Sequence, residues 1–209
     1  MENYVITVSR MFGSRGHEIA ARLGELLQIP VYDRSSVEAL VPDPGSLQNA
    51  GTEGEHSGRA EEAGAAPQSF MARLFRRDTR DHAAEEAQAM FNAQAEVIRG
   101  LAEEGSCIIL GRCGDQIFHG KKRCVNVFLF APDEVRIRNC MEMLHTDETY
   151  ARTLIASEDR TRREYRKRFS ADFPDEVTGR QLLLDSSVFG VEESARILAS
   201  AARYLFYED

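Results

Sequence analysis

The residues from Val5 to Ala20 constrain the fold of this chain more than any other segment. An apolar, β-branched run ends at Ser9, a short turn rich in glycine, serine and arginine follows, and an amphipathic helix then begins. This order is typical of a loop whose backbone N–H groups and helix N-terminus face a phosphate. A plain strand-to-helix turn is the alternative that this segment leaves open.

The loop departs from the complete phosphate-binding pattern at its most diagnostic position. In G-x-x-x-x-G-K-[ST], the lysine reaches the β- and γ-phosphates of a nucleotide, and the hydroxyl group holds Mg²⁺. When this pattern is laid on residues 13–16, the lysine position falls on Gly16 and the hydroxyl position on His17. Small residues let the backbone approach a phosphate closely, and two arginines add positive charge. The candidate phosphate-binding residues are Ser9, Arg10, Gly13, Ser14, Arg15, Gly16, His17 and Glu18.

Composition narrows the classes of function that the chain can have. Its 209 residues carry a formal net charge of −8, which argues against a protein that coats nucleic acid. Basic clusters in an acidic chain are placed locally, so they indicate specific anion sites. The four cysteines form no C-x-x-C pair, and no apolar run reaches the roughly 20 residues of a membrane span. We therefore expect a cytoplasmic protein with reduced cysteines and neither a membrane nor a nucleic acid as partner.

The remainder of the chain alternates between short apolar runs and helical patterns, which predicts a parallel sheet with helices on both faces. Residues 41–68 interrupt this alternation, because a segment so rich in glycine, proline and alanine cannot bury enough surface to offset its ordering entropy. We expect a flexible excursion there, followed by a helical insertion over 69–104. The expected strands cover residues 4–9, 29–33, 106–110, 125–130 and 181–184. The expected helices include 14–28, 35–40, 147–169 and 191–207, with Asp133 as the N-cap of another.

Ligands of parallel α/β sheets bind at the carboxyl ends of the strands. Arg112 follows the third expected strand, where its planar guanidinium can hold a phosphate through two hydrogen bonds. Pairing of Arg112 with a helix carboxylate is the alternative. A strongly basic stretch at residues 158–168 predicts a helical lid whose arginines neutralise a transferring phosphoryl group, or else a solvated helix face with i, i+4 ion pairs.

The order of these features resembles the P-loop nucleoside monophosphate kinases, and most closely the cytidylate kinase-like family. The first loop of that family reads I-S-R-x-[FY]-G-S-G-G-x-x-I-A, which is similar to residues 8–20 here. The resemblance continues at the ends of the later strands and in the lid, so it covers nearly the whole chain outside residues 41–68. The other similar segments are 31–34 (VYDR), 109–115 (ILGRCGD), 131–138 (APDEVRIR), 159–165 (DRTRREY) and 183–186 (LLDS).

This resemblance implies one α/β domain over residues 1–209 with a three-layer, P-loop NTPase-type fold. A five-stranded parallel sheet would be flanked by helices, with residues 69–104 as a monophosphate-binding lobe and 147–169 as a lid. The resemblance also implies an ATP-dependent phosphotransferase that uses Mg²⁺ and acts on CMP or a related acceptor. Its partners would then be a nucleotide and a small-molecule acceptor.

Roles for single residues follow from the same resemblance. Arg112 would hold the phosphate of the acceptor, and Arg162 would hold the transferring phosphoryl group with Arg160 beside it. Arg15 would supply positive charge in place of the missing lysine. Glu18 would either hold Mg²⁺ directly or complement the dipole of the helix that it begins.

Two acidic residues and one arginine complete the site that the resemblance implies. Asp33 and Asp115 would position the nucleotide or orient Arg112, and Arg73 would contact the acceptor from the inserted lobe. The missing lysine leaves open a nucleotide-binding sensor or regulator with little catalysis. The inserted lobe is the part least similar to the family, so a different small acceptor is also left open. The sequence defines neither the acceptor nor the oligomeric state.

Overall fold

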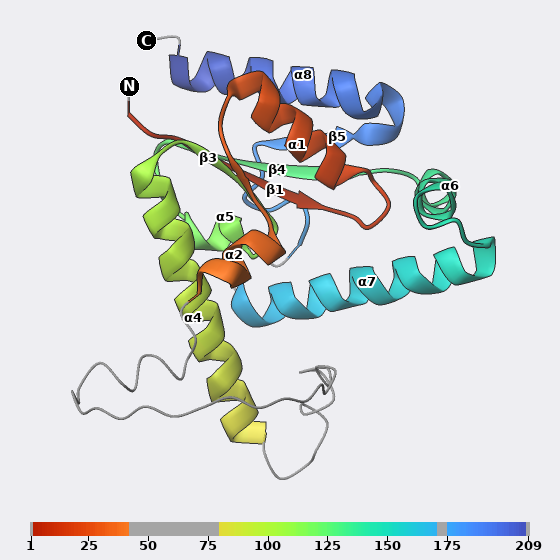
Figure 1. Ribbon diagram of the computed structural model, residues 1–209, viewed down its shortest axis with the longest axis horizontal. Helices are drawn as coiled ribbons and strands as arrows, with labels where there is room; N and C mark the ends of the chain where they lie inside the picture. Colours follow the sequence, from red (N-terminus) through yellow and green to blue (C-terminus); the bar gives the residue numbers. More distant parts are fainter. Residues whose placement is uncertain (1, 42–79, 171–174, 208–209) are drawn as a thin grey trace, which may run out of the picture.

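The computed structural model describes residues 2–41, 80–170 and 175–207 of the chain. Five parallel strands form one sheet in the order β2-β3-β1-β4-β5, which places the first strand at the centre (Figure 1). All five expected strands are present, so the predicted parallel sheet is confirmed. The strands are β1 (Val5–Arg10), β2 (Val31–Tyr32), β3 (Cys107–Leu110), β4 (Cys124–Phe130) and β5 (Leu182–Asp185).

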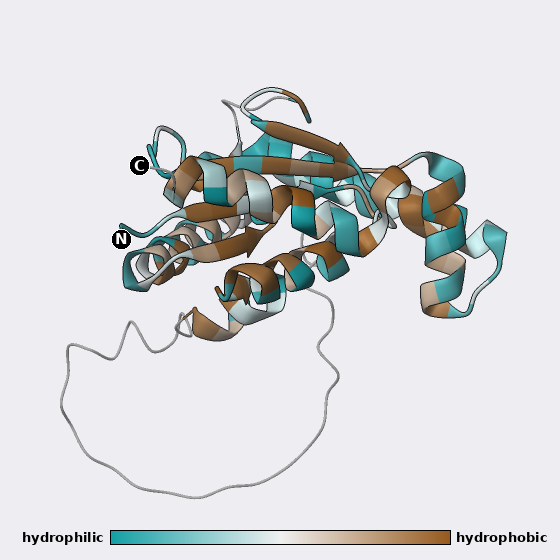
Figure 2. Cartoon of the chain, turned by 90° about the horizontal axis from the view of Figure 1, so that it is seen from above, coloured by the Kyte–Doolittle hydropathy of each residue, from teal (hydrophilic) through white to brown (hydrophobic). Residues whose placement is uncertain are grey.

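Helices cover both faces of this sheet. One face carries α1 (Gly16–Leu27) and α8 (Ser186–Tyr207), and the other carries α2 (Arg34–Leu40), α4 (Arg80–Glu104) and α5 (Gly114–Ile117). Alternate residues of β1 enter the two cores: Ile6 and Val8 pack with α1 and α8, whereas Val5 packs with the other three helices. Figure 2 accordingly shows hydrophobic strands between helices that carry both kinds of side chain.

Two further helices lie beside the carboxyl ends of the central strands. α6 (Asp133–Leu144) follows β4, and α7 (Glu148–Phe169) packs against it through Ile137 and Ile155. Asp147 begins α7 as its N-cap, accepting a hydrogen bond from the backbone N–H of Tyr150. At the opposite end of α7, Phe169 stacks on Phe91 of α4 with 4.6 Å between ring centroids. The predicted helix over 147–169 is therefore present and runs from α6 to α4 (Figure 1).

Two helix starts differ from the sequence-based expectations. Asp133 is the first residue of α6 and not its N-cap, which is Pro132. The Asp133 carboxylate instead accepts a hydrogen bond from Arg136 within the first turn. α8 begins at Ser186, ahead of the expected start at Val191, with a break at Gly190. A φ of 66° at that residue suits glycine and explains why the helical pattern seemed to start after it.

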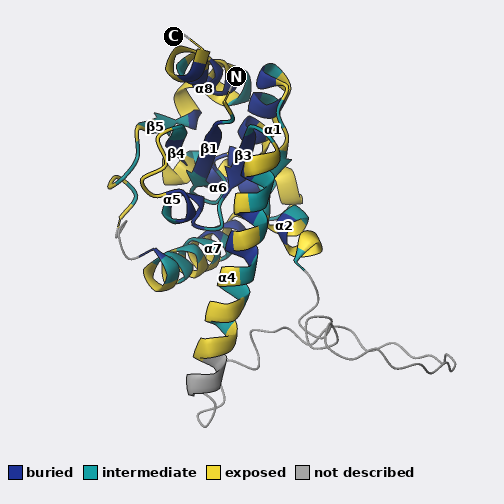
Figure 3. Ribbon diagram, turned by 90° about the vertical axis from the view of Figure 1, so that its left-hand side faces the viewer, coloured by how far each residue is buried: buried dark blue, intermediate teal, exposed yellow. Residues whose placement is uncertain are grey.

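The expected excursion over 41–68 lies outside the described residues, apart from Val41, and so does the first part of the insertion expected over 69–104. The second part of that insertion is α4. Figure 3 shows α4 buried where it packs against the sheet and exposed toward its N-terminal end. Within the described ranges, no helix combines the length and the apolar character needed to cross a bilayer.

Candidate active site

The loop between β1 and α1 is held through its carbonyl oxygens. Gly13 and Arg15 have φ values of 79° and 57°, and these turn the chain sharply from the strand into α1. Side chains of α6 and α8 donate to three successive carbonyl groups of the loop and so fix its path. The three hydrogen bonds join Arg136 to the oxygen of Phe12 (3.1 Å), Asn139 to that of Gly13 (2.9 Å) and Ser186 to that of Ser14 (2.8 Å).

The N-terminus of α1 leaves backbone donors for an anion. Arg15 occupies the N-cap position, and its guanidinium, which has only donors, cannot cap the N–H groups of the first turn. Among the described residues, no oxygen accepts from the backbone N–H groups of Gly16 and His17. Because the neighbouring carbonyls are already bonded, this end of the loop has the character of an anion site. Phosphate binding by this loop stays a prediction.

The side chain of Arg10 crosses from the end of β1 toward the end of β3. A Cβ atom on Gly16 would lie 2.8 Å from both Cβ and Cγ of Arg10, and one on Gly111 would overlap its Nη1. The two glycines therefore make room for this arginine. Burial and the nearby charges of Arg162 and Arg112 lower the pKa of Arg10 to about 10. Within the part of the chain that the structure describes, Arg10 forms no ion pair with a carboxylate.

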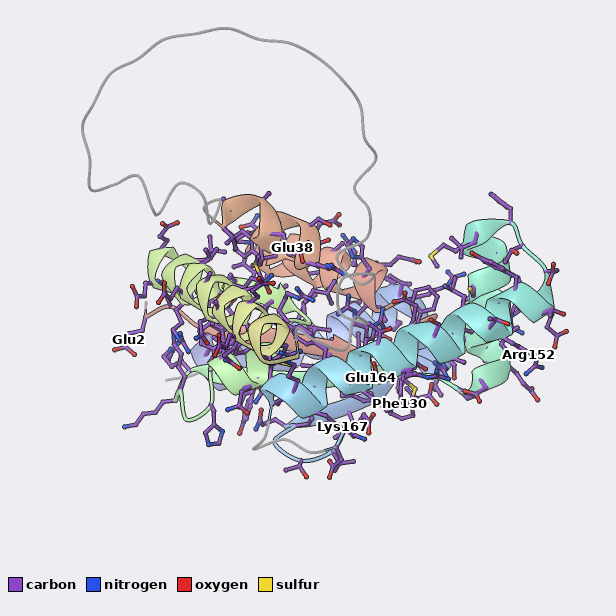
Figure 4. All side chains as sticks on the ribbon, turned by 90° about the horizontal axis from the view of Figure 1, so that it is seen from below. Glu2, Glu38, Phe130, Arg152, Glu164 and Lys167 are labelled. Atoms are coloured by element: carbon purple, nitrogen blue, oxygen red, sulfur yellow. The ribbon has the colours of Figure 1, made fainter. Side chains whose placement is uncertain are left out.

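Arg112 lies at the carboxyl end of β3, as predicted, and already has protein partners. Its Nη1 donates to Oε1 of Gln94 on α4 (3.1 Å) and to Oε1 of Glu38 on α2 (3.3 Å). Its guanidinium carbon lies 4.7 Å from the centroid of the Tyr165 ring on α7, a stabilising cation–π geometry. Arg112 thus connects three helices around the end of β3, and its carboxylate partner comes from α2, which Figure 4 marks with the label of Glu38.

Asp115 has different partners from those that the family resemblance implied. We expected this carboxylate to orient Arg112 or position a nucleotide. Its Oδ2 instead forms ion pairs with Arg166 of α7 (2.9 Å) and with Arg180, which precedes β5. Both arginines also donate to Oγ of Ser9, at 3.2 and 3.4 Å. The side chains of Asp115 and Arg180 are completely buried. Asp115 therefore pairs with two arginines other than Arg112, and its expected part in positioning the nucleotide stays a prediction.

The middle of α7 contacts the phosphate-binding loop directly. Arg162 donates from Nη1 to the backbone oxygen of Arg10 at 3.1 Å, and burial lowers its pKa. Asp159 accepts from the backbone N–H of Phe12 (3.0 Å) and pairs with the buried Arg136 (2.6 Å). Arg160, by contrast, is exposed and has no hydrogen bond or ion pair to a described residue. Residues two apart along a helix point to different sides, so in this structure Arg160 does not lie beside Arg162, and its expected role stays a prediction.

The remaining predicted residues lie at the border of the site or beyond it. Arg15 extends toward α6, where it pairs with Glu142 at 3.0 Å, and its side chain is 41% exposed. Glu18 pairs weakly with Arg15 at 3.8 Å. Asp33 caps α2 by accepting a hydrogen bond from the backbone N–H of Ser36. This hydrogen bond holds the pKa of Asp33 below its usual value. Arg73 lies outside the described residues.

No metal site is built from protein side chains alone in the described ranges. Those residues contain no group of three or more histidine, cysteine, aspartate or glutamate side chains placed to hold an ion. Glu18, the candidate Mg²⁺ ligand, is an exposed residue in the first turn of α1. Its position equally suits the acidic complement of the helix dipole that the sequence left as an alternative.

Several residues that shape the site escaped the sequence reasoning. Arg166 was visible as the residue one helical turn after Arg162, so a helix-face argument would have found it. Arg180 carried no signal, because it lies in an irregular segment outside every motif. Gln94 and Glu38 lie on helices whose contacts with Arg112 depend on the tertiary structure.

Comparison with known proteins identifies a family. The model described as the cytidylate kinase-like family matches residues 5–188. The crystal structure of an uncharacterized protein from Eubacterium ventriosum is similar with a TM-score of 0.71 and 19% identity, over 97% of this chain and 99% of that one. TT1252 from Thermus thermophilus is similar with a TM-score of 0.52 and 17% identity, over 98% and 99% of the two chains. None of the curated proteins compared with the chain matches it.

Proposed function

This chain belongs to the cytidylate kinase-like family, and from that premise we propose that it transfers the γ-phosphoryl group of ATP to a small acceptor, with CMP as the first candidate. The observation that carries the proposal is a convergence of cations and backbone donors at the carboxyl edge of the sheet. The backbone donors are those at the start of α1, and the cations are Arg10, Arg112 and Arg162. Arg166 and Arg180, which pair with Asp115, adjoin this set at Ser9.

The donor set suits a polyphosphate. Phosphoryl transfer requires little covalent chemistry from the protein, because most of the catalysis comes from positioning and from neutralising charge on the phosphoryl oxygens. ATP with Mg²⁺ would supply the phosphoryl group, and the α1 backbone donors with Arg10 and Arg162 would hold its phosphates. The Mg²⁺ ion would be held through the phosphates, since the described residues offer no set of ligands of their own.

The acceptor would bind on the side of Arg112. This residue lies next to α2 and α4, the helices that flank residues 42–79 in the chain. Its contact with Glu38 joins a side chain that is 14% exposed to one that is 39% exposed, so the carboxylate is accessible to water and can be displaced. The phosphate of an acceptor would take the place of that carboxylate on Arg112. α7 would act as the lid that carries Arg162.

We place this activity in the cytoplasm, with a nucleotide and a small-molecule acceptor as the partners. ATP is abundant in that compartment, and thiols stay reduced there. Consistent with a reducing compartment, all four cysteines are free. Burial raises the pKa of Cys107 to about 11, which keeps that thiol protonated and unreactive at neutral pH.

A nucleotide-binding sensor or regulator is the second candidate function. Two observations favour it: glycine stands at the lysine position of the loop, and Arg112 is bonded to Glu38 and Gln94. A sensor would bind nucleotide at the same loop and would not transfer the phosphoryl group.

The experiment that separates the two functions is a turnover assay with ATP, Mg²⁺ and a panel of nucleoside monophosphates and other small phosphorylated or hydroxylated acceptors. We compare the wild type with Arg112→Met and with the matched control Arg152→Met. Figure 4 shows Arg152 at the α6 end of α7, on the half of the helix opposite to Glu164 and Lys167. Turnover of CMP that falls about 10- to 100-fold in Arg112→Met alone supports the kinase. ATP binding without turnover of any acceptor supports the sensor.

A further inference from the structure

The loop has room for one long cationic side chain, and that place is taken by Arg10. A Cβ atom on Gly16 would lie 2.8 Å from the Cβ and the Cγ of Arg10. The backbone fixes the position of Cβ, so rotation of the side chain about χ1 could move Cγ away but would leave the close contact with Cβ. A lysine at Gly16 and the observed Arg10 side chain therefore exclude each other. The absence of the lysine is thus coupled to the presence of the arginine.

The end of the Arg10 side chain is accommodated in the same way. A Cβ atom on Gly111 would overlap Nη1 of Arg10, and Gly111 itself has a φ of 81°. Glycine is required here both by the backbone angle and by the space that the guanidinium occupies. Gly16 begins α1 and Gly111 follows β3, and at both places the absence of a side chain leaves room for Arg10.

Arg10 also differs from the other arginines of the site in its charge environment. Arg112 pairs with Glu38, while Arg166 and Arg180 pair with Asp115. Arg10 has no ion pair among the described residues, although it is partly buried. Its charged neighbours are Asp33 before α2, Glu158 and Arg162 on α7, and Arg112 after β3. Such a cation is poorly stabilised until an anion reaches it.

The other candidates for this role are occupied elsewhere. Arg15, which we expected to replace the lysine, pairs with Glu142 on α6 and is 41% exposed. Arg162 lies 3.9 Å from Glu158 and donates to the backbone oxygen of Arg10. Among the arginines of the described part of the site, Arg10 alone has no ion pair, and its side chain passes the N-terminus of α1 at Gly16 before its guanidinium reaches Gly111.

We propose that Arg10 is the cation that binds the polyphosphate of the donor nucleotide in this loop, in place of the lysine at the position of Gly16. This inference rests on the proposed function and names the residue that performs its central contact. Arg10 reaches the site from the end of β1, whereas the usual lysine reaches it from the first turn of the following helix. Glycine at positions 16 and 111 then leaves the space that the Arg10 side chain needs.

A consequence concerns the protein without ligand. The pKa of Arg10 is lowered to about 10 by burial and by neighbouring arginines, so the folded state binds this proton less tightly than the unfolded state. The charged side chain therefore destabilises the folded state below pH 10, and this cost disappears as the pH rises from about 10 to about 12.5. Removal of the charge should stabilise the unliganded protein at neutral pH. An arginine with a purely structural role would produce the opposite result.

The test uses the full chain and inorganic tripolyphosphate with Mg²⁺, titrated calorimetrically, with ATP–Mg²⁺ in parallel. The variants are Arg10→Met and Gly16→Ala, and Arg152→Met is the matched control on the exposed part of α7. We expect Arg10→Met to lower the affinity for both ligands about 10- to 100-fold. We also expect its Tm without ligand to rise, by about 2–4 °C for each kcal/mol gained. Gly16→Ala should weaken binding in the same direction by displacing Arg10.

Each outcome decides between the inference and the proposed function. Wild-type affinity in Arg10→Met, with a Tm at or above that of the wild type, overturns the role of Arg10 and leaves the kinase proposal standing. A loss of affinity that comes with a lower Tm assigns Arg10 a structural role and also overturns the inference. If the wild-type protein binds neither ATP nor tripolyphosphate, the proposed function and the inference both fail.

Discussion

Two groups of arginines meet at the carboxyl edge of the sheet, and they differ in how their charge is compensated. Around Asp115, Arg166 and Arg180 share one completely buried carboxylate and also bond to Ser9. Across the end of β1, Arg10 has no carboxylate in ion-pair contact among the described residues. For Arg166 and Arg180 the protein itself supplies a counter-charge through Oδ2 of Asp115, whose buried Oδ1 accepts no hydrogen bond from a described residue. For Arg10 the described residues supply no such counter-charge in ion-pair contact.

Under the proposed function, this difference separates arginines that hold the fold from the arginine that would bind a ligand. A buried ion pair contributes modestly to stability, but the loss of one partner leaves an uncompensated charge that is costly. An unpaired, partly buried cation lowers the stability of the free protein, and binding of a phosphate to that cation raises the stability again. Substitution should therefore lower the stability of the free protein in the first group and keep or raise it in the second. Single substitutions can test this difference.

The largest effect is expected from Asp115→Asn. This change leaves Arg166 and Arg180 without their buried counter-charge, at a cost of about 3–5 kcal/mol in the free energy of unfolding. Urea denaturation of the variant and the wild type measures the difference. A cost below about 1 kcal/mol would show that solvent compensates these arginines, and the contrast between the two groups would collapse.

A smaller loss is expected from Asp159→Asn, which affects the attachment of the loop to α7. The Asp159 carboxylate pairs with the buried Arg136 and accepts from the backbone N–H of Phe12. Its neutralisation should cost about 1–3 kcal/mol, because one charged partner of a buried arginine is lost. Denaturation gives the stability, and a titration with tripolyphosphate gives the affinity. Unchanged values in both would mean that α7 and the loop are not coupled through this contact.

The third prediction uses pH. Asp33 caps α2, and the hydrogen bond from the N–H of Ser36 lowers its pKa, so Asp33→Ala should cost about 1 kcal/mol at pH 7. A lowered pKa gives stability that is present above the unfolded value near 4 and is lost as the pH falls through the folded value. The difference between variant and wild type should therefore narrow when unfolding is measured at pH 3. A difference that widens toward low pH would contradict the capping role.

The smallest effect on stability is expected from Glu38→Gln, and its effect on binding should have the opposite sign. Glu38 is 39% exposed, so its pair with Arg112 contributes only about 0.2–1 kcal/mol. Loss of the carboxylate frees Arg112 for an acceptor phosphate and should raise the affinity for CMP a few-fold. Calorimetric titration of CMP decides the point. A weaker affinity in the variant would place the acceptor phosphate away from Arg112.

The framework of the fold could be predicted from the sequence because local signals agree there. Buried strands such as Cys107–Leu110 are continuous apolar runs, and the helix over 147–169 has a clear cap in Asp147. Asp133 was misjudged by one residue, because an acidic residue in the first helical turn looks like a cap in the sequence. The start of α8 was placed too late, because the break at Gly190 interrupts the helical pattern after the first turn.

The site could be predicted only where a motif marked it. Arg112 and Arg162 were found through their positions after a strand and within a basic helix. The partners of these residues come from segments far apart in the sequence: Arg180 is 65 residues from Asp115, and Glu38 is 74 residues from Arg112. The role of Arg10 depended on space, because the conflict with a side chain at Gly16 exists only in three dimensions.

The most direct test of the account compares Arg10→Met with Arg180→Met in two measurements, urea unfolding without ligand and titration with tripolyphosphate–Mg²⁺. We expect Arg10→Met to keep or gain stability and to lose affinity about 10-fold or more. We expect Arg180→Met to lose at least about 2 kcal/mol of stability, because part of the charge around buried Asp115 is removed. Equal losses of stability in the two variants, with affinity unchanged in Arg10→Met, would contradict this account.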